Sequence, residues 1–78
     1  MTRTELAQCF EIAASFVGGA TCGCYFAMMS ADVPVKWRDW FWDEFEPGLL
    51  TWERDINDPQ WKATALCFAA ERIRQGVI

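Results

Sequence analysis

The sequence predicts a compact all-α domain of about four helices that spans residues 1–78. Apolar residues recur at helical spacing, and recognisable start and stop signals bound these stretches. A hydrophobic fraction of 53%, with 15% aromatic residues, supplies the material for a dense core. Together these features argue against intrinsic disorder, despite the acidity of the chain.

The first helix is expected to begin at Thr2. Thr2 and Glu5 have the spacing of a capping box, in which each side chain accepts a hydrogen bond from the backbone N–H of the other residue. The apolar side of this helix is predicted to contain Leu6, Cys9, Phe10, Ile12, Ala13, Phe16 and Val17. Gln8, Glu11 and Ser15 are expected to face water.

Nearly all residues of the next stretch, 18–29, are small or apolar, and none is charged. Gly18 and Gly19 favour a kink or a break, followed by a buried helix or a short strand. Gly19 and Gly23 would share one helix face, on which a second helix can approach closely. The 18 uncharged residues from Ile12 to Met29 reach the lower limit of a membrane span, but five of them are Gly, Ser or Thr, so membrane insertion is not expected.

An acidic helix that is rich in tryptophan is predicted next, after the connector that contains Pro34. It should end at the turn signal Glu46–Pro47–Gly48. At 3.6 residues per turn, one side carries Trp37, Trp40, Phe41, Glu44 and Phe45, and the other carries Asp39, Asp43 and Glu46. Trp42 falls beside the acidic side, where it is either half covered by a neighbouring helix or an exposed anchor for a partner.

Two further helices complete the prediction. The spacing of Leu49, Leu50, Trp52 and Ile56 suits a short helix with Glu53 and Asp55 turned outward. The last helix should begin with Asp58 as cap and Pro59 at its first position. Its inward residues are predicted to be Trp61, Ala65, Leu66, Phe68, Ala69, Ala70 and Ile73, with Arg72 and Arg74 near its end. Gly76 suits a left-handed cap, after which Val77 folds back on the last turn.

The net charge of −4 is unevenly distributed. From Asp39 to Asp58 there are seven acidic residues and one basic residue, which gives −6, and the rest of the chain carries +2. Direct binding to nucleic acid is therefore not expected, since contact with phosphates needs a concentrated basic surface. A basic surface on another protein is the better partner.

The four cysteines are predicted to be buried free thiols in a cytoplasmic protein. Glu5 and Glu11 interrupt any apolar run at the N-terminus, so no secretory signal is expected. A disulfide and a metal site are the less favoured alternatives. Cys22 and Cys24 form a C-x-C pair, and the chain has no histidine to complete a metal site.

Enzymatic activity is not expected, and neither a cofactor nor a metal is predicted. The absence of histidine removes the commonest general base. Asp39 with Asp43, or Asp43 with Glu46, have the spacing for acid and base or for Mg²⁺. We favour a solvated helix face over this chemistry. Neither a phosphate-binding glycine motif nor a C-x-x-C redox pair is found.

The favoured function is a protein-binding module. The predicted contact residues are Asp39, Trp42, Asp43, Glu46, Trp52 and Glu53. The carboxylates would pair with cationic side chains of the partner, which would also stack on the indoles.

In size, charge and lack of catalytic motifs, the chain resembles the small acidic inhibitors carried by phages, including the anti-CRISPR class. This resemblance implies an inhibitor that occupies a basic surface, including one that normally takes nucleic acid. One alternative is a structural or homo-oligomeric subunit that associates through Gly19 and Gly23. The other is a small membrane-associated protein.

Overall fold

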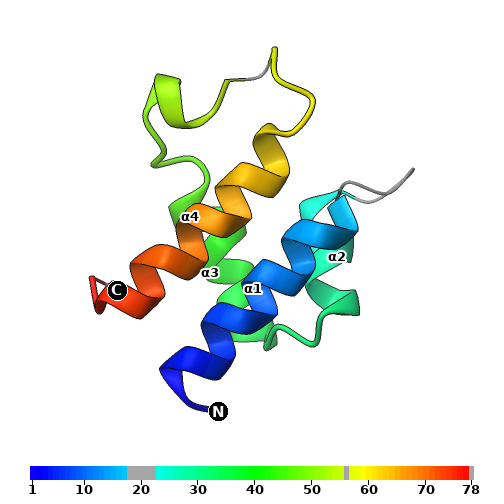
Figure 1. Cartoon of the computed structure of the whole chain (residues 1–78), viewed down its shortest axis with the longest axis vertical. Helices are drawn as coiled ribbons and strands as arrows, with labels where there is room; N and C mark the ends of the chain where they lie inside the picture. Colours follow the sequence, from blue (N-terminus) through cyan, green and yellow to red (C-terminus); the bar gives the residue numbers. More distant parts are fainter. Residues whose placement is uncertain (18–22, 56, 78) are drawn as a thin grey trace.

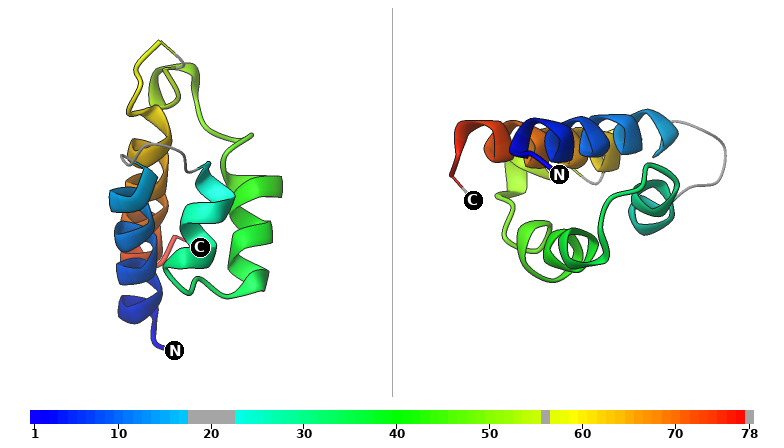
Figure 2. Two further views of the ribbon diagram at one scale, coloured as in Figure 1. Left: turned by 90° about the vertical axis from the view of Figure 1, so that its right-hand side faces the viewer. Right: turned by 90° about the horizontal axis from the view of Figure 1, so that it is seen from below.

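Two layers of helices make up the part of the chain that the computed structural model describes, residues 1–17, 23–55 and 57–77. The elements are α1 (Arg3–Val17), α2 (Cys24–Ser30), α3 (Val35–Trp40), the π-helix η1 (Phe41–Phe45), the 3₁₀-helix η2 (Thr51–Glu53) and α4 (Trp61–Gln75). Helices α1 and α4 lie side by side and antiparallel (Figure 1). Helix α2 and the continuous pair α3–η1 form the second layer (Figure 2). The prediction of an all-α fold is confirmed.

Helix α1 begins with the predicted capping box. The Glu5 N–H donates to Thr2 Oγ1 and the Thr2 N–H donates to Glu5 Oε1, both at 3.1 Å. The predicted apolar side is only partly correct, because Ile12 and Phe16 are 48% and 40% exposed. Helix α4 packs against α1, and the buried arc includes Ala7 and Ala14, which the prediction had left out. The buried residues of α1 are Leu6, Ala7, Phe10, Ala13 and Ala14.

Residues 18–29 were predicted to contain a buried helix or a short strand. From Cys24 onward the chain forms a helix, α2. Helix α2 is short and buries Cys24, Ala27 and Met28. The kink expected at the glycine pair lies outside the described residues. Pro34 is the N-cap of α3, as the connector predicted. None of the helices in the described ranges is long and apolar enough to cross a membrane.

Helix α4 ends as predicted but begins two residues later than predicted. Gly76 adopts φ 76°, and the Val77 N–H donates to the Arg72 carbonyl at 3.2 Å, which closes the C-terminal turn. At the other end, Asp58 Oδ1 accepts from the Gln60 N–H at 2.9 Å. The aspartate therefore closes a turn ahead of the helix, whose N-cap is Gln60.

Aromatic contacts join the two layers in the core. The Phe10 ring of α1 lies 6.0 Å from Phe41 and 6.1 Å from Trp40, measured between ring centroids. The largest fully buried side chains are Phe10, Phe41, Met28, Leu66, Ile73 and Val33. Because Phe41 is the first residue of η1, this core fixes the position of the acidic segment on the outside of the second layer.

Candidate protein-binding surface

A π-helical turn interrupts the segment that the sequence predicted as a regular α-helix. The Glu46 N–H donates to the Phe41 carbonyl at 2.9 Å, five residues back. This wider turn changes the angular register, so Glu44 is exposed rather than on the apolar side where α-helical spacing placed it. Phe41 and Phe45 are buried, as predicted. Isolated π-helical turns are rare and occur frequently at functional sites.

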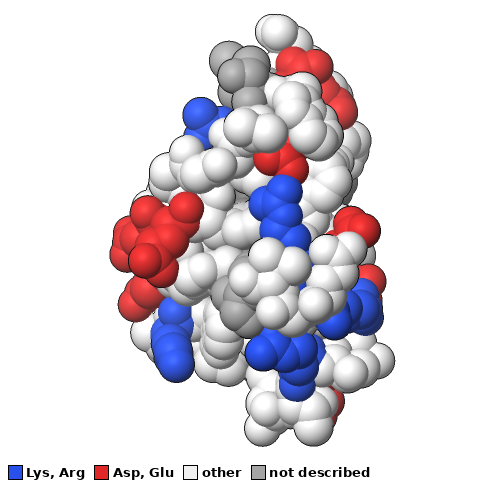
Figure 3. Space-filling model, turned by 90° about the vertical axis from the view of Figure 1, so that its left-hand side faces the viewer, with Lys and Arg blue, Asp and Glu red and all other residues white. Residues whose placement is uncertain are grey.

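A shallow groove of about 450 Å³ follows α3 and η1. Asp39, Asp43 and Glu44 contribute carboxylates to it, and Lys36 also lines it. Between them lie the half-buried indoles of Trp37 and Trp40, whose ring centroids are 5.3 Å apart in an edge-to-face arrangement. We call the six residues Lys36, Trp37, Asp39, Trp40, Asp43 and Glu44 the acidic groove. Figure 3 shows one cluster of acidic side chains at the left edge of the molecule and others at the top and right, with basic side chains mostly in the lower half of that face.

Trp42 lies next to this groove and is 54% exposed. Its ring packs edge to face on Tyr25 of α2, with 6.3 Å between centroids. The Tyr25 hydroxyl donates to Asp39 Oδ1 at 3.3 Å. Tyr25 therefore connects Trp42 to the acidic groove. Sequence analysis did not find Tyr25, because it is 14 residues from Asp39 along the chain and no local pattern links the two.

Ion pairs within the described ranges engage only some of the acidic residues, and the carboxylates of the acidic groove are among those left without one. Three ion pairs form among the described residues: Glu46 with Arg54, Glu53 with Arg72, and Glu11 with Arg74. None of them involves Asp39, Asp43 or Glu44. Glu46 was predicted to face a partner, but it is half-buried and its Oε1 lies 3.1 Å from Arg54 Nη1. Its charge is therefore already neutralised within the chain.

Glu53 was predicted to point outward, and this prediction is wrong. The residue is only 6% exposed; its Oε2 accepts from the Arg72 guanidinium and its Oε1 accepts from the Leu50 N–H at 3.0 Å. The short helix is a 3₁₀-helix, whose tighter turn places Glu53 above Leu50. Trp52 is 73% exposed, but it does not line the acidic groove. Leu49 is buried, as expected.

The cysteine prediction is confirmed only in part. Cys9, Cys24 and Cys67 are free, whereas Cys22 lies outside the described residues. Cys24 is buried, and burial raises the pKa of its thiol to about 11. Cys67, however, is exposed. No group of three potential metal ligands occurs within the described ranges.

The structure also places one of the two glycines predicted to support self-association. Gly23 is exposed at the start of α2, and a Cβ built there would meet no atom within 4 Å. Close packing within the chain therefore does not require glycine at this position. Gly19 lies outside the described residues, so the shared helix face stays a prediction.

Comparison with known proteins gives no relative: no family model, no curated protein and no solved structure matches the chain.

Proposed function

We propose that the protein is a non-enzymatic binding module that docks on a basic surface of another protein through its acidic groove and Trp42. The observation that carries this proposal is the set of three carboxylates, on Asp39, Asp43 and Glu44, that form no ion pair in the described part of the chain. They surround two half-buried indoles on a short stretch of helix. Such a cluster of like charges costs stability, so an external cation is its natural complement.

Arginine fits this groove better than lysine does. A guanidinium can stack on the exposed part of an indole and pair with a carboxylate at the same time, because it is planar and carries five donors. Asp39 and Asp43 are one helical turn apart and Glu44 adjoins them, so neighbouring arginines of a partner can each find a carboxylate. Exposed Trp42 would add apolar contact area, in keeping with the frequency of tryptophan among the residues that dominate interface energy.

A surface that normally binds nucleic acid is the target we favour, because contact with phosphates concentrates arginine and lysine on one face of a protein. Occupation of that face by carboxylates would exclude the nucleic acid, so the protein would act as an inhibitor. The resemblance to small acidic phage inhibitors in size and charge implies the same kind of target. This target also predicts that complex formation weakens as salt rises, since exposed charges are screened.

Charge reversal with a matched control tests the proposal. We expect tagged wild-type protein to capture a basic partner from a lysate of its native host, as identified by mass spectrometry. The triple variant Asp39→Lys/Asp43→Lys/Glu44→Lys should lose that partner while its helical circular dichroism stays unchanged. Glu71→Lys changes an exposed carboxylate on α4 and should retain the partner.

Binding of the purified pair then separates inhibition from simple association. Nucleic acid should compete with the wild-type protein for the partner, and Asp43→Lys should weaken the complex far more than Glu71→Lys does. Capture of the same proteins by the triple variant and the wild type would refute the proposed surface. A partner that binds equally tightly at low and high salt would also contradict a docking mode based on charge.

A further inference from the structure

A cavity of about 300 Å³ lies between the two layers, where the start of α2, the turn η1 and the first turn of α4 meet. Five of its lining side chains are aromatic: Tyr25, Phe26, Phe41, Trp42 and Trp61. We call this space the aromatic cavity. It shares no lining residue with the acidic groove. Because its rings come from three elements that are distant along the chain, no local pattern in the sequence predicted it.

The aromatic cavity has a buried floor and an exposed rim. Phe41 and Cys24 are buried, so the floor belongs to the core and is firmly held. Phe26 and Trp42, in contrast, are both more than half exposed. The Trp42 ring is fixed at the rim by its edge-to-face contact with Tyr25. A ligand that lies on the floor would also cover rings of the rim, and the removal of this apolar surface from water favours binding.

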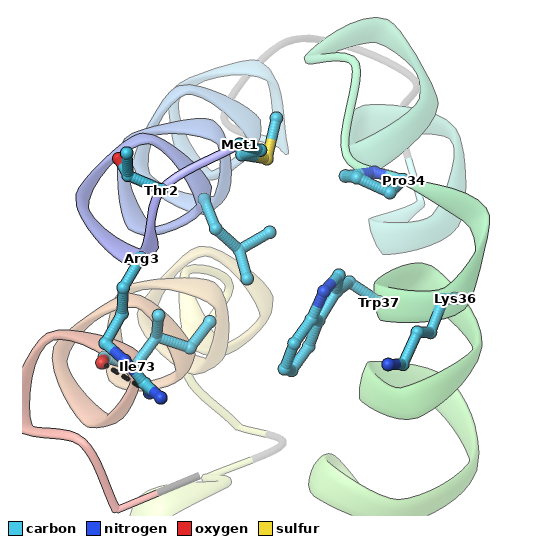
Figure 4. A pocket seen from close by; sticks show the side chains of 8 residues that line it. Met1, Thr2, Arg3, Pro34, Lys36, Trp37 and Ile73 are labelled. Carbon is cyan, nitrogen blue, oxygen red and sulfur yellow. Dashed lines mark hydrogen bonds between the residues drawn. The ribbon is translucent and has the colours of Figure 1, made fainter.

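A hollow of the same volume beside the last turns of α4 has a different wall (Figure 4). Trp37 projects into it, and within the described ranges no other aromatic residue lines it. An aromatic wall is therefore not a general property of the hollows of this molecule. Small-molecule sites are lined mainly by hydrophobic and aromatic side chains with a few polar groups, and their volumes begin at about 300 Å³. The aromatic cavity meets both conditions.

Two charged side chains line the aromatic cavity, and both have partners within the chain. Glu46 Oε1 lies 3.1 Å from Arg54 Nη1. Lys62 Nζ lies over the Trp61 ring, 5.8 Å from its centroid. The two charges are opposite in sign, so their fields partly cancel inside the cavity. The buried Cys24 thiol, whose pKa is raised to about 11 by burial, adds no charge at neutral pH. The cavity therefore favours an uncharged ligand.

We propose that the aromatic cavity binds an uncharged, planar aromatic molecule of two fused rings. Its volume is well above the ~150 Å³ that holds a single benzene ring. The ligand would lie on Phe41 and against Phe26 and Trp61, where stacked and edge-to-face contacts add to the gain from burial. A saturated molecule of the same size would gain from burial alone. This inference does not depend on the proposed protein-binding function, because none of the groove carboxylates takes part.

Calorimetric titration of the intact protein with three related probes tests this site. 2-Naphthol should bind at one site per chain. Decahydro-2-naphthol has the same carbon skeleton without aromatic rings, and it should bind about ten-fold more weakly, equivalent to ~1.4 kcal/mol. 2-Naphthoate should bind no more tightly than 2-naphthol, because both charged side chains of the wall already have partners. No binding of 2-naphthol, equal affinity for the saturated alcohol, or tighter binding of 2-naphthoate would overturn the proposal.

Two variants with the same tryptophan-to-alanine change locate the contact. Trp61→Ala should weaken 2-naphthol binding about ten-fold. Trp52→Ala should leave it unchanged, because Trp52 is exposed and does not line the aromatic cavity. Phe26→Ala, which truncates an exposed ring of the rim, should weaken binding even if Trp61→Ala loses helical content. Amide shifts in NMR spectra should change around Cys24 and Phe41. An equal loss in both tryptophan variants, or shifts centred on the hollow of Figure 4, would refute the site.

Discussion

Replacement of Glu53 by alanine tests the ion pair that joins η2 to α4. Glu53 is the only charged residue that is buried within the described ranges, and both of its oxygens are used. One accepts from the Arg72 guanidinium and the other from the Leu50 N–H. The substitution removes both interactions and leaves the Leu50 N–H without its acceptor. The resulting loss of stability should therefore exceed that of an exposed ion pair.

The size of this loss follows from burial. A backbone N–H bonded to a charged group contributes about 1.5 kcal/mol or more. A fully buried ion pair costs about 3–5 kcal/mol to break by removal of one partner, but the Arg72 side chain is 35% exposed, so about 1 kcal/mol is a better figure. The sum is about 2–3 kcal/mol. For a domain of this size that corresponds to a decrease in Tm of roughly 10–20 °C.

Urea unfolding followed by circular dichroism measures this loss. Glu11→Ala is the matched control, because it breaks an ion pair whose two side chains are 39% and 47% exposed and should cost less than about 1 kcal/mol. Glu53→Gln keeps an acceptor for the Leu50 N–H and should fall between the two. If Glu53→Ala unfolds at the same urea concentration as Glu11→Ala, Glu53 has no structural role. That result would favour the original prediction, in which Glu53 contacts a partner.

Three other measurements test the packing and the ionisable groups. Trp40→Ala should lower the free energy of unfolding by about 3 kcal/mol, whereas Trp42→Ala should change it by less than about 1 kcal/mol and impair only partner binding. The arginine partner of Glu11 lowers the pKa of this carboxyl. The Glu11–Arg74 pair therefore stabilises the fold at pH values above the ordinary glutamate pKa, and this stabilisation is lost as pH falls through the lowered pKa. Glu11→Gln should accordingly flatten the acid limb of a plot of Tm against pH. Peptide mapping after alkylation at pH 8 should show Cys67 modified well before buried Cys24, whose thiol pKa is about 11; equal rates would contradict the burial.

Local signals in the sequence predicted most of the fold. The capping box at Thr2 and Glu5 and the left-handed Gly76 depend on residues a few positions apart, so their chemistry is visible without the structure. Pro34 likewise predicted the start of α3. The errors in α1 have a different origin, because Ile12 and Phe16 are as apolar as their buried neighbours. Only the position of the neighbouring helices decides which arc of α1 is covered, and local spacing does not contain that information.

The candidate site was harder to predict because its composition depends on the helix type. The sequence correctly placed Asp39 and Asp43 on the outside and left Trp42 open between a half-covered and an exposed position, but it placed Glu44 inside and Glu53 outside. Both errors follow from the assumption of 3.6 residues per turn, since a π-helical turn moves the first residue and a 3₁₀ turn moves the second.

The π-helical turn thereby changes the charge of the surface as well as its shape. With α-helical register, Glu44 would face the core beside Phe41, where an unpaired carboxylate is costly. The wider turn buries Phe41 and Phe45 and still leaves Glu44 exposed beside Asp43. Two phenylalanines thus hold the segment on the core while three carboxylates face outward. We therefore infer that the irregular turn gives the acidic groove its third unpaired charge. A variant in which one residue of η1 is deleted should show a larger loss of partner binding than of helical content.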